Sequence, residues 1–131
     1  MGYRAKYYIP AILYVLLIFA LSSLNQVTVS KFTWGIEDFF LHAVEYHFFG
    51  VTLIWAVFRD KPWQELKPSY RLAVSIGALL AIADEFYQSF IPGRFSTVED
   101  VVADVFGVIL SIITFSLLMK IPALERFRQH A

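Results

Sequence analysis

Cysteine is absent from the 131 residues, so the chain has no disulfide, no thiolate nucleophile and no cysteine-based metal site. Charged residues are scarce at 17%, against about a quarter in an average soluble domain. Lysine plus arginine and aspartate plus glutamate number 11 each, so the basic field that attracts nucleic acid is missing and we expect no nucleic-acid partner. Apolar residues are in excess, at 58% hydrophobic and 18% aromatic.

Lysine and arginine are nearly missing from four apolar stretches, which predict four transmembrane helices at about residues 7–24, 39–58, 70–91 and 97–118. Each is close to the ~20 residues that cross a ~30 Å hydrocarbon core. A soluble helical bundle would need polar outer faces. A cleaved signal peptide would have a shorter apolar core than the first stretch, about 7–15 residues. The predicted fold class is an all-α integral membrane bundle of four transmembrane helices, in a single domain over residues 1–131.

The basic residues are unevenly divided among the connections. Nine of the 11 lie on one predicted side, namely Arg4, Lys6, Arg59, Lys61, Lys67, Arg71, Lys120, Arg126 and Arg128. Because cytoplasmic connections are enriched in lysine and arginine, both termini are predicted to be cytoplasmic in a multi-pass membrane protein. Eight of the 11 acids lie in the outward half. Some of these acids are inside predicted helices, where a charge at the helix centre costs about 2.5–3.5 kcal/mol on membrane insertion. Topology alone therefore does not explain why they are there.

Polar residues share faces on three of the predicted helices, about 5–10 Å below the outer helix ends. The spacings that place them there are His42–Glu45–Tyr46, Asp84–Gln88 and Asp100–Asp104. Together they predict one outward-facing polar cavity. The candidate acid–base residues are His42, Glu45, Asp84, Glu85, Asp100 and Asp104, and the candidate ligand-binding residues are Tyr46, Gln88 and Arg94.

Arg94 is the one strong cation expected close to these acids, and it follows the turn-forming Pro92 and Gly93. We predict that it folds back and pairs with at least one of Asp84, Glu85, Asp100 or Asp104. Its planar guanidinium would also suit a phosphate or carboxylate ligand.

The start of the fourth helix carries a capping signal. Ser96 and Glu99 fit the S-x-x-E capping box, with Thr97 as the alternative cap. Capping explains this serine better than a nucleophilic role does, so no nucleophile stands out in the cluster.

A metal site is a second interpretation of the cluster. His42 and His47 are five residues apart, about 140° around a helix, so they cannot both ligate one ion without distortion. One histidine with several carboxylates suits Mn²⁺, Mg²⁺ or Ca²⁺ better than structural zinc. A divalent cation is therefore the only cofactor considered, with no cofactor as the alternative.

Two segments resemble the signature regions of the VanZ-like family of small membrane proteins. They are DFFLHAVEYHFFG and ADEFYQSFIPGRFSTVEDVVADVFGVILS, and the resemblance covers most of the chain beyond residue 37. The specific pattern, D-E-x-x-Q…P-G-R-x-S…D, matches at Asp84, Glu85, Gln88, Pro92, Gly93, Arg94, Ser96 and Asp100, and the weaker region matches at Asp38, His42, Tyr46 and Gly50. The chain departs from the family at Phe39, where lysine is frequent, at Asp104, where asparagine is common, and at Ser111, where glycine is common.

The resemblance implies a role in the cell envelope, as a multi-pass protein of the bacterial cytoplasmic (inner) membrane. The family is named for a member associated with teicoplanin resistance. One hypothesis is an enzyme acting on an envelope lipid or glycan head group through acid–base chemistry. The other is a non-catalytic binding or accessory protein that changes how envelope components or a glycopeptide antibiotic are presented. A small proton-coupled transporter component is the third hypothesis. Membrane lipids are the expected surroundings in each case, and the sequence leaves enzymatic activity and oligomeric state open.

Overall fold

The computed structural model describes residues 5–24, 36–60 and 66–122. A short 3₁₀ helix, η1 (Ala5–Tyr8), leads into α1 (Ile9–Ser22), followed by α3 (Ile36–Asp60), α4 (Leu66–Gln88) and α5 (Val98–Leu118). The described part contains no strand, and four of its helical segments are long and apolar enough to cross a membrane. The predicted all-α fold of four membrane-spanning helices is confirmed, and the chain is a multi-pass membrane protein.

Two helices differ most from their predicted boundaries. α3 begins at Ile36 rather than 39, and α4 spans Leu66–Gln88 rather than 70–91. Pro68 is tolerated near the start of α4 because a first-turn residue needs no backbone N–H partner. The helix ends before a turn in which Arg94 N donates to Ile91 O at 3.1 Å. Gly93 takes a positive φ of 84° there, which glycine adopts without strain.

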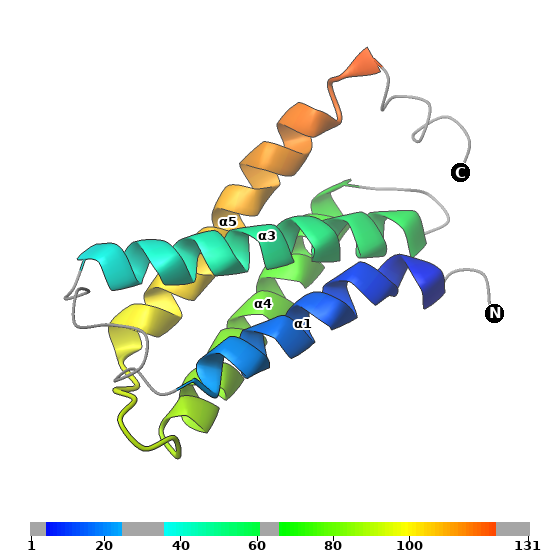
Figure 1. The fold of residues 1–131 in the computed structure, drawn as a ribbon. Helices are drawn as coiled ribbons and strands as arrows, with labels where there is room; N and C mark the ends of the chain where they lie inside the picture. Colours follow the sequence, from blue (N-terminus) through cyan, green and yellow to red (C-terminus); the bar gives the residue numbers. More distant parts are fainter. Residues whose placement is uncertain (1–4, 25–35, 61–65, 123–131) are drawn as a thin grey trace.

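The four long helices alternate in direction, so their ends form two groups (Figure 1). The C-terminal ends of α1 and α4 lie near the N-terminal ends of α3 and α5, and we call this the acidic end. The other group contains the start of α1, the end of α3, the start of α4 and the end of α5, and we call it the basic end. α3 packs most extensively on α5, with α4 and α1 completing the bundle.

Small residues allow α3 and α5 to cross closely. A Cβ placed on Gly107 would collide with the carbonyl group of Ala43, and one on Gly50 would collide with Ser111. Close backbone approach at small residues is how membrane helices gain packing energy without a hydrophobic driving force. The small residues Ala103, Gly107 and Ser111 of α5 are buried in this crossing.

The core of the basic end is aromatic. Phe115 of α5 is 1% exposed. Its ring lies 6.4 Å from Trp55, 5.8 Å from Phe58 and 6.4 Å from Tyr70, in edge-to-face geometry. Such pairs contribute about 0.5–1.5 kcal/mol beyond their burial, so this end is held together by ring packing.

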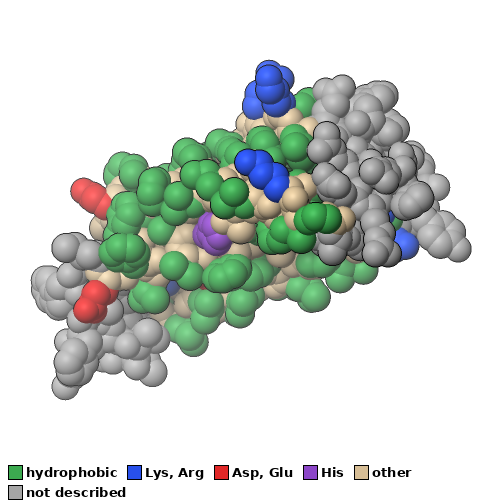
Figure 2. Space-filling view, turned by 90° about the horizontal axis from the view of Figure 1, so that it is seen from above, with side chains coloured by type: hydrophobic (Ala, Val, Ile, Leu, Met, Phe, Trp, Pro, Cys, Tyr) green, Lys and Arg blue, Asp and Glu red, His purple; other side chains and the backbone are tan. Residues whose placement is uncertain are grey.

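The outer surface is apolar over its middle section (Figure 2). Large side chains such as Leu16, Leu79, Phe86 and Phe90 are more than 60% exposed. Figure 2 shows acidic side chains near one end of this face, and basic ones over its middle and toward the opposite end. That distribution fits a bundle surrounded by lipid. Arg4, Lys31, Lys61, Arg126 and Arg128, which entered the orientation prediction, lie outside the described residues.

Candidate functional site

The predicted site residues meet at the acidic end of the bundle, where α3, α4 and α5 converge (Figure 1). His42 and Asp104 each lie six residues inside the start of their helix, and Asp84 lies four residues before the end of α4. At 1.5 Å per residue these positions are roughly 6–9 Å along the helices from their ends. The three helices therefore bring their polar groups to a similar depth, as the spacing predicted.

A histidine–aspartate pair forms the centre of the cluster. His42 Nδ1 lies 2.9 Å from Asp104 Oδ1, joining α3 to α5. Asp104 is 0% exposed and His42 is 7% exposed. The pair lies between α3 and α5, away from both lipid and water. A charge-assisted hydrogen bond of this kind fixes the imidazole ring in one orientation.

The second group of contacts connects α4 to α1. Gln88 Nε2 donates to Asp84 Oδ2 at 3.0 Å and to Ser22 Oγ at 3.3 Å. All three side chains are at most 3% exposed. The sequence prediction missed Ser22, although its position in the last turn of the first helix was a usable signal. α1 therefore contributes to the site as well as covering it.

The third group connects α4 to the start of α5. The backbone N–H of Thr97 donates to Glu85 Oε2 at 3.1 Å. Thr97 is the N-cap of α5, because its hydroxyl accepts from Asp100 N at 3.2 Å and donates to Asp100 Oδ2 at 2.8 Å. The alternative cap is thus the real one, and the Ser96 prediction is wrong, because α5 begins at Val98 and only Thr97 is in register.

Arg94 does not make the predicted ion pair. Within the described residues no carboxylate lies within 4.0 Å of its guanidinium, and its buried Nε has no hydrogen-bond partner. The short Gly93-containing turn nevertheless keeps it half-buried and within electrostatic reach of Glu45 and Asp84. Arg94 therefore lies near the acids without making an ion pair with them.

Several buried polar atoms at the acidic end have no hydrogen-bond partner. They are Glu45 Oε1, Tyr46 Oη, Asp84 Oδ1, Glu85 Oε1, Asp104 Oδ2 and Arg94 Nε. Tyr46 is 0% exposed, and its hydroxyl is within electrostatic reach of Asp104, Asp84, Glu45 and Glu85. An unsatisfied buried polar group is costly, so a concentration of them points to a functional site. All nine predicted site residues are in this region, and their chemical roles stay predictions.

Two overlapping sets of side chains have the spacing of a metal site. His42, Glu85 and Asp104 are all buried, and their ligand atoms lie within 4.8 Å of one another. Asp38, His42 and Asp100 meet the same distance criterion, with Asp38 only half-buried. His47 belongs to neither set, and its Nε2 lies 3.3 Å from Thr114 Oγ1 on α5. His42 and His47 therefore contact different residues of α5, as expected for two side chains that point in different directions from α3.

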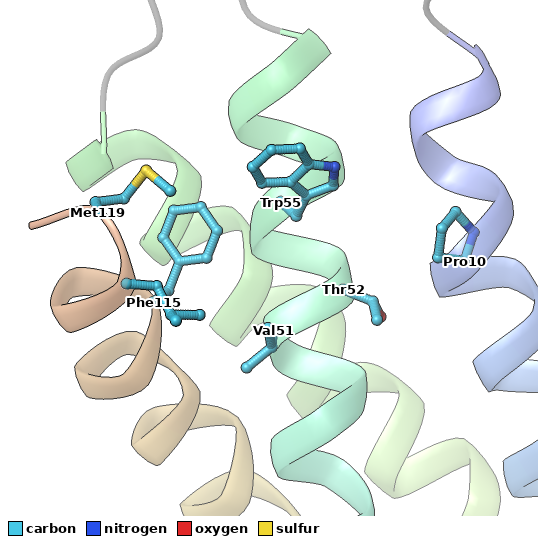
Figure 3. A pocket seen from close by; sticks show the side chains of 7 residues that line it. Pro10, Val51, Thr52, Trp55, Phe115 and Met119 are labelled. Carbon is cyan, nitrogen blue, oxygen red and sulfur yellow. The ribbon is translucent and has the colours of Figure 1, made fainter. Parts of the chain in front are cut away.

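A groove of about 190 Å³ lies toward the basic end, between α1, α3 and α5 (Figure 3). It is lined by Pro10, Val51, Thr52, Trp55, Phe115, Leu118 and Met119. Its one side-chain hydroxyl, on Thr52, donates to Phe49 O of the same helix at 2.7 Å. The groove offers apolar packing and contains no titratable side chain.

A family model described as VanZ/LLP1 matches residues 9–119, which include all four long helices and every residue of the acidic cluster. No curated protein and no solved structure gives a significant match. The match covers most of the chain and includes both segments on which the resemblance rests. The chain therefore belongs to the VanZ/LLP1 family.

Proposed function

We propose that this protein binds the polar head group of an envelope lipid or glycan at the acidic end, and so influences susceptibility to glycopeptide antibiotics such as teicoplanin. In this proposal the chain spans a bacterial cytoplasmic membrane, with both termini in the cytoplasm and the acidic end facing outward. The orientation rests on the concentration of lysine and arginine at the basic end.

The observation that carries the proposal is the buried His42–Asp104 pair, surrounded by carboxylates with unpartnered oxygens. Each acid buried in a membrane helix costs on the order of 2.5–3.5 kcal/mol on insertion scales. Apolar side chains would build the same bundle at lower cost. Charged groups kept in a membrane protein despite that cost mark a binding or transport site.

The depth of the cluster favours a head group over an acyl chain. His42 and Asp104 lie roughly 9 Å along their helices from the acidic end, within reach of the interface. Their neighbours Tyr46 and Gln88 supply hydroxyl and amide groups suited to sugars and amino-sugars. Arg94, positioned above them and lacking an ion pair within the described ranges, supplies a donor for a phosphate or carboxylate.

Acid–base catalysis on the bound head group is the second candidate, and it is favoured by the same pair. A histidine held by a carboxylate is the arrangement of a general base whose orientation is fixed. Thr97 is used as a helix cap, so this candidate chemistry is assigned to the His42–Asp104 pair and not to a threonine nucleophile. Binding is common to both candidates and is the conclusion stated here.

The test is a susceptibility assay in a teicoplanin-sensitive bacterium that expresses the full chain. We expect wild type to raise the inhibitory concentration, and His42→Gln and Glu85→Gln to lose that effect at equal membrane abundance. Glu99→Gln is the matched control, because Glu99 is an exposed acid in the first turn of α5. Site variants that protect as well as wild type would contradict the proposed site. A wild type without effect would contradict the link to glycopeptides.

Binding can be tested independently of the antibiotic phenotype by comparing the envelope lipids and glycans that co-purify with wild type and with Glu85→Gln. Mass spectrometry of purified wild type should detect a head-group-bearing molecule that Glu85→Gln no longer retains. Equal retention by both proteins would contradict binding at this cluster, whatever the susceptibility assay shows.

A further inference from the structure

The geometry points to a binding site for one divalent metal ion, held by His42 of α3, Glu85 of α4 and Asp104 of α5. This inference goes beyond the proposed function and does not depend on it. It rests on four features of the acidic end: ligand spacing, unpartnered oxygens, an unpartnered tyrosine hydroxyl and an excess of carboxylates.

The spacing is that of ligands around a single ion. The ligand atoms of the three side chains all lie within 4.8 Å of one another. Two ligands at ~2.2 Å from one ion can be at most ~4.4 Å apart, so only a small adjustment is needed. Because each ligand comes from a different helix, bound metal would connect α3, α4 and α5.

In each of the two carboxylates, Glu85 and Asp104, one oxygen has a hydrogen-bond partner and the other has none. Glu85 Oε2 accepts from Thr97 N at 3.1 Å, while Glu85 Oε1 has no partner. Asp104 Oδ1 is bonded to His42 at 2.9 Å, while Asp104 Oδ2 has no partner. Glu85, oriented through one oxygen by a backbone N–H and open at the other, has the outer-shell support found around metal ligands. At Asp104 the ion would replace the proton shared with His42.

Tyr46 provides an observation independent of the acids. Its side chain is 0% exposed and its hydroxyl has no hydrogen-bond partner, although Asp104, Asp84 and Glu45 are within electrostatic reach. A buried hydroxyl normally has a partner. A metal-bound water or the ion itself would supply one at this position.

The charge balance favours an added cation. Six carboxylates gather here, from Asp38, Glu45, Asp84, Glu85, Asp100 and Asp104, whereas His42 and Arg94 are the two groups that can oppose them. Four carboxylates are thus left over, and neighbouring like charges in a poorly solvated site cannot all stay ionised. A divalent ion would neutralise two of them.

The donor set selects the class of ion. One imidazole nitrogen with two carboxylate oxygens is a mixed donor set that fits a transition-metal ion such as Mn²⁺, Fe²⁺ or Zn²⁺ better than Mg²⁺ or Ca²⁺, which prefer all-oxygen sites. Mn²⁺ also permits a direct measurement, because its paramagnetic resonance signal changes when it leaves bulk water.

The experiment uses the full chain, purified in detergent with its affinity tag removed, stripped with a chelator and titrated with Mn²⁺. We expect one bound equivalent, a higher melting temperature with Mn²⁺, and nitrogen coupling in the pulsed resonance spectrum of the bound ion. The near-isosteric variants Glu85→Gln and Asp104→Asn should bind Mn²⁺ at least about tenfold more weakly. Glu99→Gln should bind like wild type.

Histidine variants assign the nitrogen. His42→Gln should remove the nitrogen coupling, and His47→Gln should retain it. The wild-type titration is decisive even where a site variant fails to fold. No binding of Mn²⁺ at millimolar concentration, or bound Mn²⁺ without nitrogen coupling, would overturn the inference. Loss of binding in Asp38→Asn but not in Glu85→Gln would also overturn it, because the ion would then lie at the Asp38–His42–Asp100 group.

Discussion

The two ends of the bundle place their charges in opposite ways. At the acidic end the charged side chains of Asp84, Glu85 and Asp104 are at most 4% exposed and point between helices. At the basic end the interior is aromatic, and Lys67, Arg71 and Lys120 are exposed. The same fold thus has one end built by packing and one end where packing is interrupted by charge.

This difference between the two ends indicates which charged residues need a functional explanation. Charges on the periphery of the basic end are accounted for by topology and by contacts with the interfacial region. Arg59, for example, lies over the Tyr7 ring at 5.0 Å and over the Trp55 ring at 5.7 Å. Neither topology nor interfacial contacts account for the buried carboxylates of the acidic end. The acidic end is therefore where a ligand site is expected, and the basic end is where stability is expected.

The largest effect should come from breaking the buried pair at the acidic end. Asp104→Ala leaves His42 without its partner, and losing one member of a buried pair costs about 3–5 kcal/mol. We expect a large fall in melting temperature in detergent. The double change Asp104→Ala with His42→Ala should be milder than the sum of the single changes, because the two residues interact. Additive single and double changes would show that the pair contributes no coupling.

At the basic end, Phe115→Ala should destabilise the bundle without affecting the site. Truncation of a buried phenylalanine costs about 3 kcal/mol or more in soluble cores, and the lower figure applies here since lipid is itself apolar. Melting temperature should fall, whereas Mn²⁺ affinity and antibiotic susceptibility per folded molecule should match wild type. A loss of Mn²⁺ binding equal to that of Glu85→Gln would remove the distinction between the two ends.

Thr97→Ala should have a smaller effect at the boundary of the site. It removes the hydroxyl that caps α5 but keeps the backbone N–H that donates to Glu85. Loss of an N-cap costs about 1 kcal/mol, which a small shift of the melting temperature would report. Thr97→Ser retains the hydroxyl and should behave like wild type. Equal shifts in both variants would show that the cap is not the cause.

Arg94→Ala should change stability least, by less than about 1 kcal/mol, because no carboxylate lies within 4.0 Å of the guanidinium among the described residues. The susceptibility effect should still be lost, and Arg94→Lys should restore charge but not bidentate geometry. Unchanged stability with lost activity assigns Arg94 to the ligand. A fall of several kcal/mol in Arg94→Ala would instead show that it stabilises the acids.

The sequence predicted the structure best where residue type and helical periodicity indicated the same arrangement. The long apolar stretches specified four helices, and three- and four-residue spacings put His42 and Asp104 on inward faces. Helix ends were less predictable, because α4 tolerates Pro68 in its first turn and stops a turn before Ile91. Local sequence patterns do not determine where a helix begins or ends, because the boundary also depends on packing against neighbouring helices.

Contacts between distant segments were the least predictable part. Ser22 reaches Gln88 across 66 positions, and Thr97 N reaches Glu85 only because the turn after α4 closes tightly. The place of the Arg94 guanidinium was equally unpredictable, because a count of charges does not show that it lies more than 4.0 Å from every carboxylate of the described residues. Residue types identified the participants, but the crossing of α3 and α5 at Gly107 determined the partners.

The most direct test of the account is which end of the bundle faces the cell exterior. The chain has no native cysteine, so single cysteines can be placed at Phe95, which is 76% exposed at the acidic end, and at Lys120, which is exposed at the basic end. An impermeant thiol reagent added to intact cells should label Phe95→Cys and leave Lys120→Cys unlabelled until the cells are opened. Labelling of Lys120→Cys but not Phe95→Cys would place the polar cluster on the cytoplasmic side and contradict an envelope ligand.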